Sequence, residues 1–319
     1  MTSTAVRRHP PAGAVGLVVL GAVCHYLGPA IAVLLFAHVA SLGVAWLRMA
    51  SAAVVFALMR SPRSAWRSAT GQERRLVVAL GIVLALMNAA FYLALERLPL
   101  ATVAAIEFLG VIALAAYGAR VRRNLAALAL TVVGVALLSE VHLAGSALGL
   151  ALAGANCVGF MCYVAVGHRL ANVATGRRTA ALDRLSLAVA IGAVAASPIG
   201  LSPALPALHH PWWLLWGVGV GVCSTVIPYL TDQLAMARLP RATYSLLLAL
   251  LPVTATVCGV LVLRQVPSSR DLAGLALVVV GVAVHRPLVP DPPGELTRPD
   301  TGRPRRSRCA PRDVPARGG

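Results

Sequence analysis

The 319-residue chain is too apolar to be a water-soluble globular protein. Hydrophobic residues make up 58% of it and charged residues 12%, with a mean hydropathy of +0.79, which leaves too little polar surface to cover a soluble core. The net charge of +17 would indicate nucleic acid only if the basic residues formed one face. All 28 are arginines, and all but Arg48 lie between apolar runs or in the C-terminal tail. Composition therefore predicts an integral membrane protein, and excludes nucleic acid as a partner and most soluble enzymes.

Ten apolar runs are long enough to cross a bilayer, which takes about 20 residues of helix. The first follows Arg7-Arg8 as a signal peptide would, but it is too long and no small-residue cleavage site follows it, so we expect an uncleaved helix. The sequence thus predicts an all-α polytopic membrane protein with about ten transmembrane helices. The expected spans are 14–36, 38–59, 76–95, 101–118, 125–141, 147–166, 185–200, 212–235, 242–263 and 272–288.

The distribution of arginine predicts the orientation. If both termini are cytoplasmic, 24 arginines fall inside, three fall outside, and Arg48 lies within a span. This asymmetry is typical of a multi-pass protein of the bacterial plasma membrane. We expect residues 1–13 to be a cytoplasmic N-terminus. Residues 289–319, rich in Pro, Gly and Arg, are expected to form a disordered basic cytoplasmic tail near the membrane surface.

Two segments of the chain repeat. The pattern Ala-x-x-Arg-Leu-Pro-x-Ala-Thr occurs at 94–102 and again at 235–243, an offset of 141 residues. The pattern Val-Val-Gly-Val-Ala occurs at 132–136 and at 279–283, an offset of 147. The second copy therefore carries about six extra residues, which we place around 264–270.

The repeat divides the chain into two halves, 14–141 and 147–288, with five predicted helices each. An odd number of spans makes the second half enter the membrane from the opposite side. Inverted repeats of this kind are typical of secondary transporters, whose substrate site lies near the midplane between the repeats. We therefore expect a transporter that works by alternating access within the lipid bilayer. The sequence leaves open whether it is a monomer or a homodimer.

Several motifs, in order along the chain, resemble the drug/metabolite transporter superfamily with two EamA-type halves, and within it the threonine/homoserine exporter group. The resemblance covers residues 14–286 and implies export of small amino acids or related metabolites, driven by an ion gradient, with protons as the expected ion. The stretches that carry it are Gly43-Val44-Ala45-Trp46-Leu47-Arg48, Met87-Asn88-Ala89-Ala90-Phe91-Tyr92-Leu93, Ile106-Glu107-Phe108-Leu109-Gly110 and Ser224-Thr225-Val226-Ile227-Pro228-Tyr229.

The chain also departs from the pattern of that group. Val111 stands where members usually have a proline, and Leu251 precedes Pro252 where they often have an acidic residue. Arg264-Gln265 replaces a Gly-Glu pair.

Two charged residues, Arg48 and Glu107, lie well inside predicted spans, where insertion of a charge costs a few kcal/mol unless it meets a partner or water. Glu107 is a candidate for proton or substrate handling, with a structural ion pair to Arg48 as the alternative. Arg48 could hold a substrate carboxylate with its planar guanidinium, or serve as the partner in that pair.

Neutral polar side chains form faces on two predicted helices. Asn88 and Tyr92 are four residues apart, and Asn156 and Tyr163 are seven apart, so each pair shares one side of its helix. Both pairs could line a wet cavity or simply hydrogen-bond between helices. His25 could carry protons, or be an ordinary hydrogen-bonding group.

Asp232 lies late in the eighth predicted span, four residues after Pro228, and is a candidate gate carboxylate or a partner of Arg238 or Arg241. Pro228 and Pro252 remove backbone donors inside their helices and predict kinks there.

The sequence holds no signature of an enzyme, a cofactor site or a metal site. It contains no HExxH, no Gly-x-Ser-x-Gly and no Walker motif, so transport would be secondary. Its six cysteines include no CxxC pair, and His209-His210 alone make a poor metal site. Two alternatives remain: a transporter of another solute, such as a drug-like cation or an imported metabolite, and a membrane assembly or regulatory protein that does not transport.

Overall fold

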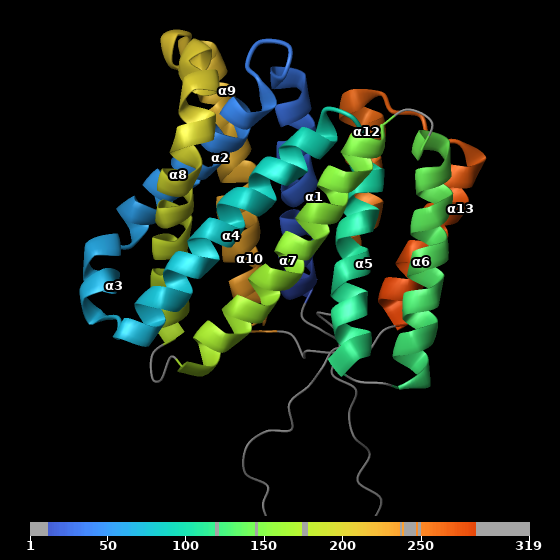
Figure 1. Cartoon of the computed structure of the whole chain (residues 1–319), viewed down its shortest axis with the longest axis horizontal. Helices are drawn as coiled ribbons and strands as arrows, with labels where there is room; N and C mark the ends of the chain where they lie inside the picture. Colours follow the sequence, from blue (N-terminus) through green and yellow to red (C-terminus); the bar gives the residue numbers. More distant parts are fainter. Residues whose placement is uncertain are drawn as a thin grey trace, which may run out of the picture. The chain divides into compact units, whose positions relative to one another are not determined.

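A computed structural model describes residues 12–118, 121–143, 146–173, 178–236, 238, 247 and 250–284, and within these residues helices joined by short turns make up the structure (Figure 1). The helices are α1 (Ala12–Leu35), α2 (Ser41–Met59), α3 (Pro62–Ser68), α4 (Gly71–Leu95), α5 (Leu100–Gly118), α6 (Arg122–Leu143), α7 (Ala147–Val173), α8 (Arg178–His209), α9 (Pro211–Gly221), the π-helical turn η1 (Val222–Val226), α10 (Ile227–Met236), α12 (Leu250–Leu263) and α13 (Ser269–Val284). The predicted tail 289–319 lies outside the described residues.

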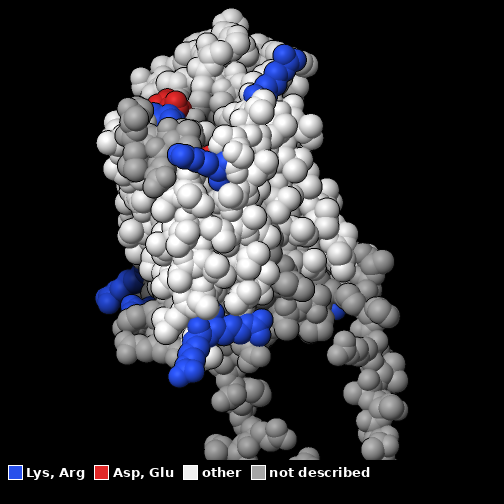
Figure 2. All heavy atoms as spheres, turned by 90° about the vertical axis from the view of Figure 1, so that its right-hand side faces the viewer, with Lys and Arg blue, Asp and Glu red and all other residues white. Residues whose placement is uncertain are grey.

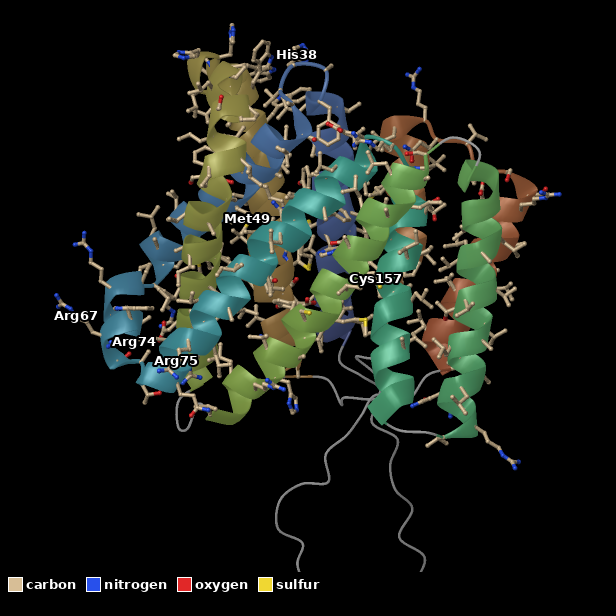
Figure 3. The ribbon with its side chains drawn as sticks, viewed as in Figure 1. His38, Met49, Arg67, Arg74, Arg75 and Cys157 are labelled. Carbon is tan, nitrogen blue, oxygen red and sulfur yellow. The ribbon has the colours of Figure 1, made fainter. Side chains whose placement is uncertain are left out.

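Six helical stretches in the described part are long and apolar enough to span a membrane: α1, α2, α4, α7, α8 and the continuous stretch from α9 to α10. Segments of α5 and α12 are shorter apolar helices. On the face shown in Figure 2, charged side chains lie toward the two ends, with a broad uncharged belt between them. In Figure 3, Arg67, Arg74 and Arg75 gather at one end of the bundle and His38 lies at the other. The predicted all-α polytopic membrane protein is confirmed.

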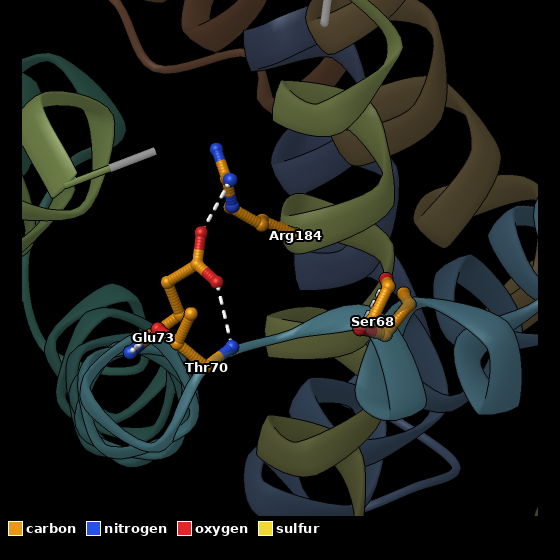
Figure 4. Close-up of polar contacts among 5 residues, drawn as sticks. Ser68, Thr70, Glu73 and Arg184 are labelled. Atoms are coloured by element: carbon orange, nitrogen blue, oxygen red, sulfur yellow. Dashed lines mark hydrogen bonds and ion pairs between the residues drawn. The ribbon is translucent and has the colours of Figure 1, made fainter. Parts of the chain in front are cut away.

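The start of α4 is fixed by a capping box and an ion pair (Figure 4). The backbone N–H of Glu73 donates to Thr70 Oγ1 at 3.3 Å, and the Thr70 N–H donates to Glu73 Oε2 at 2.8 Å. Glu73 Oε1 also accepts from Arg184 Nη2 of α8 at 2.6 Å. Because these bonds satisfy the first-turn donors, α4 begins five residues before the predicted span 76–95 and is tied to α8.

The predicted span 185–200 was too short, because α8 runs from Arg178 to His209 through three prolines. A proline removes one intrahelical bond, but neighbouring helices can hold such a helix in place within a membrane bundle. Here α8 packs along α2. Gly43 lies so close to it that a Cβ there would be 2.6 Å from the Pro203 carbonyl carbon.

The remaining helices pack in pairs. α4 packs on α7, α6 on α13, and α1 on both α10 and α12. One buried apolar cluster joins α1, α2, α4, α5, α6, α7, α8, α9, α12 and α13, and a second joins α2, α4, α7, α8 and η1. Residues 242–246, 248 and 249 of the predicted span 242–263, and most of the second Arg-Leu-Pro turn, lie outside the described residues.

The α6–α13 pair is in backbone contact. A Cβ at Gly134 would lie 2.6 Å from the Gly274 carbonyl oxygen, and a Cβ at Gly274 would lie 2.7 Å from the Gly134 carbonyl oxygen. A methyl group could not be added to either glycine without moving a helix, because the nearest opposing atoms belong to the backbone. Small residues that allow such an approach are typical of helix pairs in membranes.

We expect Gly134→Ala to destabilise the protein and Gly154→Ala to leave it unchanged or stabilise it. The first methyl group would overpack the contact, at a cost of about 1–3 kcal/mol. The second would meet nothing within 4 Å and would gain helix propensity of up to about 1 kcal/mol. Thermal unfolding of both purified variants in detergent measures the difference. Equal melting temperatures would contradict the close contact.

Candidate functional site

A cavity of about 400 Å³ lies among α1, α2, α4, α5, α7, α8, η1, α10 and α12. Its size is that of a small-molecule pocket. Met49, labelled in Figure 3, marks the α2 wall. The polar lining residues are His25, Tyr26, Arg48, Asn88, Glu107, Asn156, Tyr163, Ser224, Thr225, Tyr229 and Asp232. The other lining residues are Val18, Gly21, Ala22, Pro29, Met49, Leu84, Met87, Phe91, Phe108, Phe160, Val164, Val189, Pro228 and Leu251.

Arg48 on α2 is held by neutral groups from two other parts of the bundle. Its Nη1 donates to Asn88 Oδ1 at 2.7 Å, and its Nε donates to Thr225 Oγ1 at 3.1 Å. Its Nη2 donates to the Ser224 carbonyl at 3.3 Å. These three bonds fix the guanidinium at the cavity wall without neutralising its charge.

Asn88 positions Arg48. Its Oδ1 accepts from Arg48, and its Nδ2 donates to the Ala45 carbonyl at 2.9 Å, so both ends of the buried amide are used to join α4 to α2. Tyr92, predicted on the same side of the helix, lies behind the arginine and is not among the lining residues. Its ring centroid is 5.7 Å from the Arg48 guanidinium carbon, which is within cation–π range.

The Ser224 carbonyl can serve Arg48 because of Pro228. In an α-helix this carbonyl would accept the N–H of residue 228, and proline has none. The helix loosens over the same residues into the π-turn η1, where the Ile227 N–H bonds to the Val222 carbonyl. The kink predicted at Pro228 therefore coincides with a π-turn that turns a backbone oxygen toward Arg48. The kink predicted at Pro252 involves residues 248 and 249, which lie outside the described residues.

We expect Pro228→Ala to weaken solute transport. Alanine would give the Ser224 carbonyl a competing intrahelical donor, so Arg48 would lose a charged hydrogen bond worth about 1.5 kcal/mol, roughly tenfold in KM. Initial rates of transport in proteoliposomes measure this change. Pro198→Ala, on the exposed side of α8, is the matched control and should leave KM unchanged. An unaltered KM in Pro228→Ala would contradict the role of this carbonyl.

Glu107 on α5 is also held by a neutral partner. Asn156 Nδ2 of α7 donates to Glu107 Oε2 at 2.9 Å, and Asn156 is 1% exposed. The direct pairing of Glu107 with Arg48, weighed from the sequence, is absent, since the ion pairs in the described part of the chain join other residues. Asn88 and Thr225 hold the arginine on its own side of the cavity. An arginine and a glutamate thus line one cavity without pairing with each other.

The other predicted residues also reach this cavity. The Tyr163 hydroxyl of α7 lies 3.2 Å from that of Tyr229 on α10, which makes a hydrogen bond across the lining. Asp232 and His25 belong to the lining as well, and the His25 ring packs edge-on against Tyr26. The proposed partner Arg241 lies outside the described residues.

Sequence reasoning missed several features of the lining, among them the acceptors that Thr225 and the Ser224 carbonyl offer to Arg48. The Tyr26 side chain is 1% exposed, and its hydroxyl has no hydrogen-bond partner among the described residues, so a polar atom is left over at the cavity. Its position next to His25 in an otherwise apolar span could have indicated it. Leu251, noted only as a departure from a family pattern, is also part of the wall.

A multi-helix membrane bundle in which an arginine and a glutamate line a central cavity without pairing is typical of a transporter of small solutes. Comparison with known proteins also indicates a transporter. The EamA-like transporter family matches residues 173–285. Threonine/homoserine exporters RhtA of Salmonella typhimurium (strain LT2) and Escherichia coli (strain K12) are each 32% identical over 260 residues, covering 79% of this chain and 84% of theirs. The chain belongs to the EamA-like transporter family.

A solved crystal structure of another protein shares the fold. It is 22% identical, with a TM-score of 0.51, and the match covers 84% of this chain and 96% of that one. The apolar helices and the exporter relatives make this chain a multi-pass protein of the bacterial inner membrane that handles a small-molecule solute, and a transporter rather than an enzyme.

Proposed function

We propose that the protein exports small zwitterionic amino acids, threonine and homoserine among them, by proton-coupled alternating access. One observation carries this proposal: Arg48 and Glu107 line the same cavity, and each is bound by neutral groups instead of by the other. A buried charge without a counter-charge is costly. A solute that carries one negative and one positive charge would supply a counter-charge to both residues at once.

The hydrogen-bond geometry supports such a solute. A guanidinium has five N–H donors, and Arg48 uses one on each of its three nitrogens. One donor on Nη1 and one on Nη2 are left, which suits bidentate binding of a carboxylate. Glu107 Oε1 is left to accept from an ammonium group, while the Tyr26 hydroxyl can bond a hydroxylated side chain.

The proposed architecture is a pair of inverted five-helix repeats, 14–141 and 147–288, with both termini cytoplasmic. Exchanging α1, α2, α4, α5 and α6 for α7, α8, α9–α10, α12 and α13 turns most of the main packing pairs into one another. The contact of α4 with α7 becomes that of α10 with α1, and α1 with α12 becomes α7 with α5. The pairs α2–α8, α5–α12 and α6–α13 map onto themselves. A two-fold relation between the halves accounts for this pattern.

Proton coupling is assigned to Glu107. When protonated, this carboxyl group no longer attracts the ammonium group of the solute, so a proton entering the cavity would favour release. His25 and Asp232 line the same cavity and could pass the proton on.

We expect cells that make the protein, and lack their own exporters, to expel preloaded labelled threonine and homoserine faster when the outside is acidified. Glu107→Gln should abolish the dependence on the pH gradient. Arg48→Gln should raise KM about 10-fold or more, because a charged hydrogen bond to the carboxylate is lost. Uptake into inverted membrane vesicles measures both effects.

Glu96→Gln and Arg97→Gln are the matched controls. These two residues pair with each other at 2.8 Å in the α4–α5 turn, away from the cavity lining. Their substitution should change neither KM nor the dependence on the pH gradient. If Glu107→Gln keeps a full response to the gradient, the proton role is wrong. Unchanged flux in Arg48→Gln as well would favour a non-transporting assembly or regulatory protein.

A second candidate function is transport of a larger apolar solute. The cavity, at about 400 Å³, is walled mostly by apolar side chains, including Phe91, Phe108, Phe160 and Leu251. Such a wall suits a bulky apolar body better than the short polar side chain of threonine.

A panel of labelled solutes decides between the two candidates. Threonine and homoserine are compared with leucine, phenylalanine and a lipophilic cation in the same vesicles. We expect Leu251→Asn to improve the rate for threonine relative to leucine, because it adds a polar group to the wall. Preferred transport of the lipophilic cation would exclude an amino-acid exporter.

A further inference from the structure

A second hollow lies outside the central cavity, beside the short helix α3 that connects α2 to α4. It is a groove of about 290 Å³, lined by Pro62, Arg63, Trp66, Arg67 and, from α8, the buried Leu187. α3 packs on α8. The groove therefore combines an apolar floor with the two exposed arginines, Arg63 and Arg67, which we call the rim arginines.

The groove is strongly cationic. The rim arginines are four residues apart, so they share one side of α3. Between them Trp66 is 38% exposed, and the guanidinium carbon of Arg74 lies 5.1 Å from its ring centroid. In Figure 3, Arg67 and Arg74 lie beside α3. Trp66 thus shares the groove with the two rim arginines and carries a third guanidinium group, that of Arg74, on its ring.

The neighbouring carboxylates are already bound elsewhere. Glu73 is paired with Arg184 at 2.6 Å, and Asp183 lies 3.7 Å from Arg60. Among the described residues, the rim arginines take part in none of the ion pairs. Their charge is therefore available to an anion from outside the chain.

The groove lies where a membrane surface would be. The candidate span α2 ends at Met59, three residues before α3 begins. Leu58 and Met59 are 83% and 51% exposed, as expected for side chains facing hydrocarbon. Tryptophan and arginine directly beyond such a span are typical of the headgroup level.

We propose that this groove binds one anionic phospholipid. The rim arginines hold the phosphate of the headgroup, while Trp66 and Leu187 contact the first part of an acyl chain. Arginine matches the geometry of a phosphate oxygen pair, and basic pockets between membrane helices are known to recognise anionic headgroups. A lipid at this place would bridge α3 and α8 and so support the cytoplasmic end that we assign to the bundle.

The test is native mass spectrometry and thermal unfolding of the purified full chain, titrated with phosphatidylglycerol or with phosphatidylcholine of the same acyl chains. We expect phosphatidylglycerol to bind and raise the melting temperature, and phosphatidylcholine to do neither. The double variant Arg63→Gln/Arg67→Gln should bind phosphatidylglycerol roughly 10- to 30-fold more weakly.

Arg122→Gln/Arg169→Gln removes two exposed arginines of α6 and α7 and is the matched control, which should bind like the wild type. Arg63→Lys/Arg67→Lys keeps the charge and should retain most of the binding. Equal binding by the glutamine variant and the wild type would overturn the proposal, and so would equal binding of phosphatidylcholine. If inorganic phosphate alone raised the melting temperature as much, the site would be one for free phosphate and the lipid assignment would fall.

Discussion

The guanidinium of Arg48 sets the main constraint on this structure. A charge at that depth requires several hydrogen-bond acceptors, and no single helix supplies them. Asn88 from α4, Thr225 and the Ser224 carbonyl from η1 converge on it. The π-turn, the proline that follows it, and the close packing of α2 against α9 and η1 all contribute to this one requirement. The cavity lies where these helices meet. The acceptors bind only part of the Arg48 guanidinium, and the remainder faces the cavity.

The sequence predicted a large part of this arrangement, for definable reasons. Apolar runs give the membrane helices because bilayer thickness fixes their length, and Arg48 and Glu107 were recognisable because charges are rare at that depth. That Arg48 and Glu107 do not pair with each other was not predictable, because it depends on the hydrogen bonds that they make to Asn88 and Asn156 instead. The full length of α8 was missed because its three prolines indicate a helix end in sequence, whereas tertiary packing supports the helix through them. The role of the Ser224 carbonyl was missed because it is a backbone atom, which no side-chain pattern reports.

The two buried asparagines have similar tasks on opposite charges. Asn88 offers its oxygen to a cation, and Asn156 offers its nitrogen to an anion. An amide can do either without charge of its own, so each keeps a charged group in place while leaving it unneutralised. Aspartate at 88 would neutralise the arginine, and arginine at 156 would neutralise the glutamate. Amides in both places therefore preserve the pair of charges that a zwitterion would need.

The glycine contact between α6 and α13 has a mechanical consequence. Gly134 and Gly274 are in mutual backbone contact, so neither helix can slide along the other without a steric clash. We therefore expect α6 and α13 to move together as one rigid unit. α13 also contacts α5, which carries Glu107, whereas neither α6 nor α13 contributes to the cavity wall. In the alternating access that we propose, the two halves would then pivot about the α6–α13 pair, with the largest displacement on the side of the bundle away from it, at α2, α4 and α8.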